Sequence, residues 1–159
     1  MKTPGVYIIE KNAFPNSVVE VATAIPAFIG HTQFARDGNK DLTGIPFRIS
    51  SMAELHSFFG FAPTLRFGIR PEDSESEDTN DINVLFPDGS CQLTLPKTFY
   101  ALYYNMLLFY ANGGGPCYIV SVGDYEHDFK SIDFTNALLA LKKEQEPTLV
   151  VVPEAVYME

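Results

Sequence analysis

The chain has no tryptophan and only two cysteines among its 159 residues. Cys91 and Cys117 do not have the C-x-x-C spacing of a redox or zinc motif. So few thiols are typical of a protein from a reducing compartment, where we expect both side chains to be buried as small hydrophobic groups. A single disulfide between them stays open as an alternative, without positive support from the sequence.

Long apolar runs are also missing. The first ten residues lack the basic head and apolar run of a secretory signal peptide. No stretch approaches the roughly 20 apolar residues that span a bilayer. We therefore expect neither an ordinary secretion signal nor direct membrane insertion. At 46% hydrophobic and 19% charged residues, the composition is that of an ordinary globular domain.

Basic residues are scarce, with 11 Lys and Arg against 20 Asp and Glu, for a net charge of −9. Phosphate backbones and anionic lipid surfaces repel such a chain, so we expect no nucleic-acid partner. The acidity is local, because six acids fall within residues 72–81 and removing them leaves −3. This acidic run lacks the central glycine and closing glutamate of an EF-hand. We therefore interpret it as a solvated, exposed loop rather than a calcium site.

Residues that could carry chemistry do not form a recognisable motif. His31, His56 and His127 do not have metal-ligand spacing, and His127 lies in a run, DYEHD, that is typical of a surface loop. No serine lies in a G-x-S-x-G elbow, and neither cysteine has an activating neighbour in sequence. We predict no catalytic residue, no metal, no cofactor and no enzymatic activity.

Short apolar runs alternate with helical patterns along the chain. The order helix, strand, helix, strand across 98–152 is typical of parallel strands with helices packed on them. The sequence therefore predicts an α/β fold, a parallel or mixed sheet flanked by helices, with strands near Ala27, Ile119 and Val151 in one sheet. The expected strands are Ile25–Gly30, Phe47–Ile49, Cys117–Val122 and Thr148–Val152, and the expected helices are Ser51–Gly60, Thr98–Ala111 and Phe134–Lys143.

The expected elements carry several local signals. Ser51 and Glu54 form a capping box, and Asp133 is the expected cap of the last helix. The run Thr148–Val152 is apolar throughout, which predicts a strand buried on both faces. Residues 61–96, which hold the acidic run, are expected to form an irregular, exposed insertion.

A glycine run follows the longest predicted helix and precedes a predicted strand. Phosphate-binding loops run in the opposite order, from a strand into a helix, so that the helix N-terminus meets the anion. The run is therefore interpreted as a turn that ends the helix, with Pro116 preventing its continuation. The residues of this helix-stop turn are Asn112, Gly113, Gly114 and Gly115.

The N-terminus predicts an extended arm, residues 1–22, ahead of a core at 23–159. The run VYII is β-prone, and the break at 12–17 separates it from the core. An isolated strand exposes its backbone groups, which pairing with a neighbouring molecule would satisfy. The inter-subunit arm is expected to use Val6, Tyr7, Ile8 and Ile9; the alternative is an edge strand on the chain's own domain.

Five segments, in order, resemble the sheath subunits of contractile tails: phage tails, type VI secretion and extracellular contractile injection systems. The sequence around Asn112–Val122 is most similar to the extracellular, antifeeding-prophage-like branch of this family. The resemblance spans most of the chain outside 61–96. Its segments are TPGVYIIE at 3–10, VATAIPAFIG at 21–30, SMAELHSFFG at 51–60, FYANGGGPCYIVSVG at 109–123 and LVVVPEA at 149–155.

This resemblance implies a structural subunit that stacks in rings around an inner tube and contracts to drive that tube through a target envelope. It implies neighbouring sheath subunits, the inner tube protein, and baseplate and tail-terminator proteins as partners. The mature particle would be a phage tail or a released extracellular particle. Family subunits are typically longer, so we expect the N-terminal part of a sheath fold, an incomplete one. The competing interpretation is a stand-alone α/β domain that binds a small ligand at its strand ends.

Overall fold

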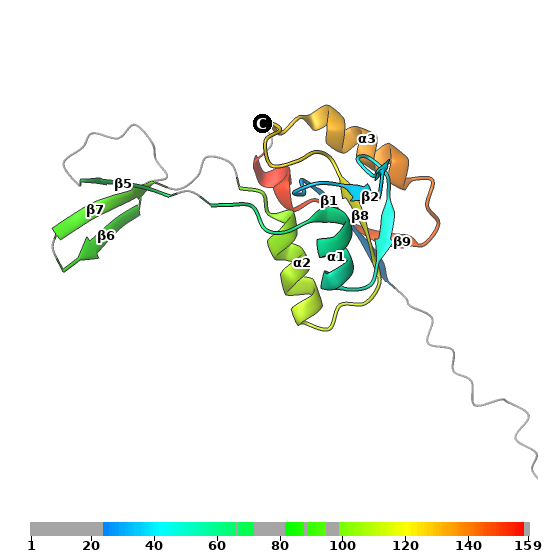
Figure 1. Ribbon diagram of the computed structural model, residues 1–159, viewed down its shortest axis with the longest axis horizontal. Coiled ribbons are helices and arrows are strands. Elements are labelled where there is room, and N and C mark those ends of the chain that lie inside the picture. The colour runs from blue at the N-terminus through cyan, green and yellow to red at the C-terminus, as the bar shows by residue number, and fades with distance from the viewer. Residues whose placement is uncertain (1–23, 66, 72–81, 88, 95–98, 158–159) are drawn as a thin grey trace, which may run out of the picture.

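The computed structural model describes residues 24–65, 67–71, 82–87, 89–94 and 99–157. The predicted arm, residues 1–22, and the acidic run, residues 72–81, lie outside the described residues. The described chain forms a core of sheet and helices and a smaller sheet that stands apart from it (Figure 1).

A four-stranded mixed sheet forms the centre of the core. Its strands are β1 (Ile25–Gly30), β4 (Phe47–Ile49), β8 (Cys117–Ser121) and β9 (Pro147–Val151), in the order β4-β8-β1-β9. Strand β1 runs parallel to β8 and to β9, whereas β4 runs antiparallel to β8. The predicted α/β class, and the placing of Ala27, Ile119 and Val151 in one sheet, are therefore confirmed.

Helices cover both faces of this sheet. Helices α1 (Met52–Phe59) and α2 (Leu102–Ala111) pack on one face, where Leu102 and Met106 are fully buried beside Ile119. Helix α3 (Ser131–Leu141) packs on the other face. Alternate residues of β1 therefore belong to two different core clusters, and all six positions of the strand are buried.

The helix boundaries agree with the sequence in part. The Ser51 hydroxyl accepts from the backbone N–H of Glu54 at 3.3 Å, as predicted, and Gly60 ends α1 with a φ of +85°. The Glu54 carboxylate reaches Ser50 rather than Ser51. The predicted start of the last helix is wrong, because α3 begins at Ser131. Asp133 lies in its first turn, where a carboxylate still favours the positive end of the helix dipole.

The insertion is not irregular where it is described, which corrects the expectation for 61–96. It forms an antiparallel sheet of β5 (Gly68–Pro71), β6 (Ile82–Phe86) and β7 (Gly89–Thr94) in the order β5-β7-β6, called here the insertion sheet. The acidic run interrupts the sequence between β5 and β6 and so hides their alternating pattern. Strand pairing satisfies the backbone groups of β7 on both sides and those of β5 and β6 on the side that faces β7.

Three smaller features complete the description. Strands β2 (Arg36–Asp37) and β3 (Lys40–Asp41) form a short hairpin, and η1 (Pro153–Tyr157) is a 3-10 helix after β9. Within the described residues, the longest helix is α3 with 11 residues, and none has the length and apolar character needed to cross a membrane.

Candidate functional site

The helix-stop turn at Asn112–Gly115 has the geometry that the sequence predicts. The Gly113 N–H donates to the carbonyl of Tyr110 at 3.1 Å, and the Gly114 N–H donates to the carbonyl of Phe109 at 2.9 Å. Gly113 has a φ of +81°, which favours glycine. This is the Schellman motif that ends many helices. The N–H groups of Gly113 and Gly114 are already hydrogen-bonded to the helix and so are not available to bind a phosphate.

Strand β9 is an open edge of the central sheet, and the prediction that it is buried on both faces is wrong. It pairs with β1 on one side only. Leu149 and Val150 point to opposite faces of the sheet and remain 55% and 45% exposed. An apolar parallel strand normally has cover on both faces. Within the described residues, no strand lies on the outer side of β9, and the helices leave Leu149 and Val150 largely uncovered, so this edge presents unpaired backbone groups and apolar side chains together.

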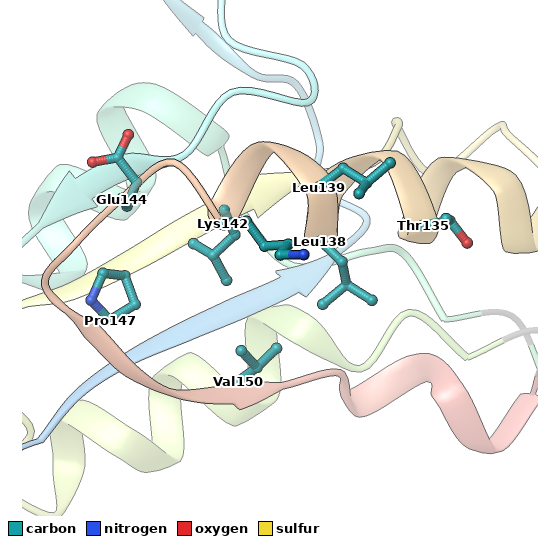
Figure 2. Close-up of a pocket in the computed structure, with 8 residues that line it drawn as sticks. Thr135, Leu138, Leu139, Lys142, Glu144, Pro147 and Val150 are labelled. Atoms are coloured by element: carbon teal, nitrogen blue, oxygen red, sulfur yellow. The ribbon is translucent and has the colours of Figure 1, made fainter.

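An apolar groove runs between α3 and β9. Its volume is about 390 Å³. Leu138 on α3 and Val150 on β9 point into the space between the two elements, and Lys142 lies along its rim (Figure 2). Leu138 and Leu139 are 41% and 55% exposed. The α3–β9 groove therefore continues the apolar surface of the open edge onto the helix.

A second, polar hollow of about 550 Å³ lies at the carboxyl ends of β1 and β8. This is where open α/β sheets bind small ligands. The buried polar groups beneath it are already paired with each other. The Thr32 and Ser121 hydroxyl oxygens lie 2.6 Å apart, and the Thr32 N–H donates to the Gly123 carbonyl at 3.0 Å. These buried hydroxyls therefore have little hydrogen-bonding capacity left for a ligand, whereas Lys130 and Asp133 line the wall of the hollow with charged groups.

The rim of this hollow carries His127, the histidine of the run DYEHD. Its Nδ1 lies 2.6 Å from Asp124 Oδ1, and both side chains are exposed. The backbone N–H of Glu126 also donates to Asp124, and the hydrogen bond from His127 is the main cause that lowers the pKa of Asp124. No group of three or more potential metal-ligating side chains occurs in the described part of the chain.

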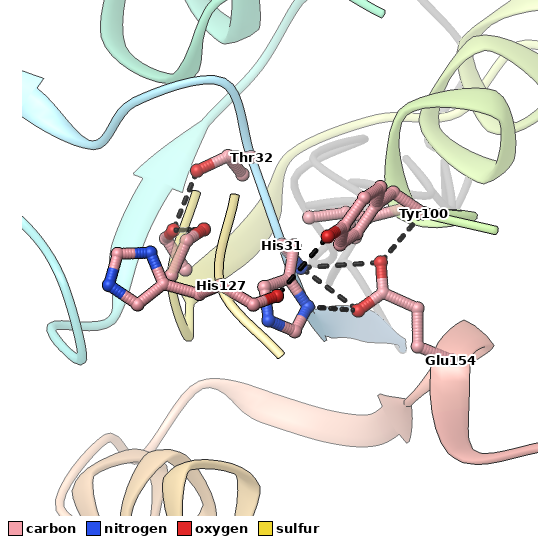
Figure 3. Close-up of polar contacts among 8 residues, drawn as sticks. His31, Thr32, Tyr100, His127 and Glu154 are labelled. Atoms are coloured by element: carbon pink, nitrogen blue, oxygen red, sulfur yellow. Dashed lines mark hydrogen bonds and ion pairs between the residues drawn. The ribbon is translucent and has the colours of Figure 1, made fainter. Parts of the chain in front are cut away.

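The core contains a buried ionisable pair, His31 and Glu154, shown in Figure 3. His31 is 2% exposed and Glu154 is fully buried. The Glu154 carboxylate lies 2.7 Å from His31 Nδ1 and also accepts from the backbone N–H groups of His31, at 3.0 Å, and Leu102, at 3.4 Å. One side chain from η1 thus joins the end of β1 to the start of α2.

Aromatic rings close the other sides of His31. Tyr100, Phe129 and Phe134 each place a ring within 6 Å of the imidazole, in edge-on geometry. The hydroxyl of Tyr100 donates to the carbonyl of His127 rather than into the cluster. The pair is enclosed by the described residues, and its hydrogen bonds hold the end of β1, the start of α2 and η1 together.

The cysteines do not form a reactive site. Both are free thiols; Cys117 is buried as expected, whereas Cys91 on β7 is only half-buried. Burial raises the pKa of Cys117, whose sulfur lies 3.3 Å from the Tyr110 hydroxyl. A buried, protonated thiol is a poor nucleophile. His56, the remaining histidine, has its Nε2 3.1 Å from the Tyr103 hydroxyl, in a structural contact between α1 and α2.

The sequence did not indicate the function of Glu154. Its only signal was an acid one residue after Pro153, directly behind an apolar strand. The predicted arm residues, Val6–Ile9, lie outside the described residues, so their pairing stays a prediction.

No protein-family model matches the sequence. A search of curated proteins likewise found no match.

Proposed function

We propose that this chain is a structural subunit that assembles with other subunits by strand addition, as part of a contractile tail sheath. The observation that carries the proposal is the open edge at β9, which exposes Leu149 on one face and Val150 on the other. A strand added there would pair the free backbone groups of β9 and cover its apolar side chains. Self-assembly would thus account for both exposed features of β9, its unpaired backbone edge and its uncovered apolar side chains.

The arm supplies a strand of suitable character for this edge. Val6, Tyr7, Ile8 and Ile9 are β-prone and apolar, and the sequence has 15 residues between them and β1. At about 3.3 Å per extended residue, that linker spans up to about 50 Å. It is long enough to reach a neighbouring molecule, and pairing with a neighbour at every step gives an open polymer.

The proposed sheath assignment gives this assembly a function. It rests on the resemblance of five sequence segments, and implies neighbouring subunits, of the same or another kind, and an inner tube protein as the first partners. The polymer would be assembled in the bacterial cytoplasm and would drive the tube on contraction. Baseplate and tail-terminator proteins would bound it at its two ends.

Removing the arm tests the proposal. Deletion of Met1–Lys11 from the full chain should leave a folded, soluble subunit that no longer forms sheath, because the core keeps its own contacts. Circular dichroism reports folding, and negative-stain electron microscopy reports sheath. An unfolded product would show that the arm is a strand of its own domain. Normal sheath without the arm would contradict strand addition.

The polar hollow at the strand ends supports a second candidate, a small-ligand-binding domain. Its volume, about 550 Å³, suits a small molecule. Binding would raise the melting temperature of a monomeric protein as ligand is added. A screen of small polar metabolites by differential scanning fluorimetry, read with the oligomeric state, separates the two candidates. Polymer without any ligand-dependent shift favours the subunit.

A further inference from the structure

The 3-10 helix η1 docks on the core through one buried side chain (Figure 3). Within Pro153–Tyr157, Glu154 alone is buried, whereas Val156 and Tyr157 are 79% and 43% exposed. The ring of Tyr157 adds a surface contact with Phe129, at 6.3 Å between ring centres. A docked segment is ordinarily held by apolar side chains, which carry no titratable group. Here the buried group is a carboxylate, so docking depends on its state of protonation.

Gly30, the last residue of β1, makes room for this carboxylate. A Cβ at this position would lie 3.0 Å from Glu154 Oε1 and 3.0 Å from Leu102 Cβ. Because glycine has no Cβ, the carboxylate can approach the backbone closely. It accepts there from the N–H groups of His31 and Leu102. The contact is therefore built into the end of β1 and the start of α2.

The partners of Glu154 are all nitrogen atoms. Two are backbone donors, and the third is Nδ1 of His31, at 2.7 Å. This hydrogen bond holds one proton between Nδ1 and the carboxylate, whichever of the two carries it. A second proton would make both groups donors, so the carboxyl O–H would have no acceptor among these partners. The pair would also carry a net positive charge, and an unpaired buried charge is costly.

The surroundings of the pair offer little to offset such a charge. The rings of Tyr100, Phe129 and Phe134 enclose His31. Burial, and then the charge of Glu154, raise the pKa of Tyr100, which therefore stays neutral in acid.

Other titratable side chains near the pair are exposed or half-buried. The Asp124 carboxylate is already paired with His127. Asp133 lies on α3, and the tyrosines at the start of α2 and in the loop after β8 are neutral in acid. These remaining groups are Tyr103, Tyr104, Tyr125, Glu126, Asp128 and Lys130. A second proton on the pair is therefore best accommodated by exposing the pair to water.

We propose that η1 is an acid-sensitive contact, released from the core when the His31–Glu154 pair takes up a second proton. Because η1 follows β9 directly, its release frees the carboxyl end of that strand, which is then held to the sheet by its pairing with β1. The release itself is independent of self-assembly. Its consequence, that strand addition at β9 weakens in acid, rests on the proposed function.

Hydrogen exchange measured by NMR on the full chain tests the release. The amides of His31 and Leu102 report it directly, because Glu154 is their acceptor. Protection factors, which correct for intrinsic exchange, are compared at about pH 7 and about pH 4, a range that includes the ordinary titration of histidine and glutamate. Both should fall about tenfold or more in acid, which corresponds to ~1.4 kcal/mol.

The buried strand β8 (Cys117–Ser121) is the internal reference for global unfolding. Its protection should stay constant while that of the two reporter amides falls, because local release leaves the core folded. Reporter protection that does not change with pH, or that is lost together with that of β8, would overturn the proposal. This comparison needs no variant, so it decides the matter even if the substitutions below do not fold.

Two variants assign the response to the buried pair. His31→Asn combined with Glu154→Gln replaces both titratable groups by amides that can still hydrogen-bond, and it should abolish the pH response of the reporter amides. Asp124→Asn breaks the exposed pair with His127, whose atoms lie 2.6 Å apart, and should leave the response unchanged. A response that survives the double substitution, or that Asp124→Asn abolishes, would overturn the proposal.

Negative-stain electron microscopy of the same proteins tests the consequence for assembly. Polymer formed at neutral pH should be lost in acid by the wild type and retained by the double variant. Release of the reporter amides with polymer unchanged would overturn the consequence for β9 and leave the proposed function intact. Release in a protein that forms no polymer at either pH would support the acid-sensitive contact and count against the proposed function.

Discussion

Replacing Glu154 by alanine should destabilise the protein more than any surface substitution. The change removes the acceptor of His31 Nδ1 at 2.7 Å and of two backbone N–H groups, those of His31 and Leu102. All of these donors are then buried without a partner, because η1 packs over the end of β1. Breaking a buried pair by removing one partner costs about 3–5 kcal/mol.

That cost is a large part of the free energy of unfolding, which is typically about 5–15 kcal/mol for a domain. Glu154→Gln keeps one carbonyl acceptor of nearly the same shape. It should therefore cost less, about 1–3 kcal/mol, the range for unsatisfied buried polar groups. The ordering of the two variants follows from the number of acceptor atoms that each retains.

Urea unfolding followed by circular dichroism measures these differences, provided that the slope of the transition stays constant. Glu126→Ala is a suitable control, because Glu126 is exposed and surface substitutions usually change stability by less than about 0.5 kcal/mol. A loss below about 1 kcal/mol for Glu154→Ala would refute this reasoning. It would mean that water or a shifted η1 replaces the carboxylate.

Three further predictions concern stability. Replacing the six acids of 72–81 by serine should leave the midpoint of urea unfolding nearly unchanged and raise the isoelectric point; a large loss of folding or assembly would reveal a structural or ion-binding element. Gly113→Ala should cost about 1–2 kcal/mol, because its φ of +81° is unfavourable for a residue with a Cβ, whereas Gly115→Ala, which meets no atom within 4 Å, should be neutral in the same assay. Met106→Ala should lower the free energy of unfolding by about 2–5 kcal/mol, because Met106 is fully buried. Leu108→Ala should lower it by less than about 0.5 kcal/mol, because Leu108 is 64% exposed. Similar losses for the two variants would contradict the assigned buried face of α2.

Local signals in the sequence were sufficient for the core elements. The apolar runs at 25–30 and 117–122 are strands, because continuous β-prone residues in a short run suit a strand buried on both faces. Ser51 and Gly60 mark the ends of α1, and Gly113 marks the end of α2, because caps depend on residues within one turn. These features need no information from distant residues.

Features that depend on distant residues were not predictable. The apolar run of β9 looked buried, but the exposure of Leu149 and Val150 depends on which elements lie beside the strand. Glu154 pairs with a histidine 123 positions away in sequence, so no local pattern shows its role. The strands of the insertion sheet are short, and the acidic run between β5 and β6 concealed their pairing.

Hydrogen exchange at β9 tests most directly whether this edge is the site of assembly. Among the described residues, the backbone N–H groups of Thr148–Val151 that face away from β1 have no partner strand, since β9 is an edge strand. Assembly by strand addition should slow their exchange in the polymer relative to the isolated subunit, and deletion of Met1–Lys11 should abolish that protection. Unchanged exchange at β9 in a polymer that protects other residues would contradict the account.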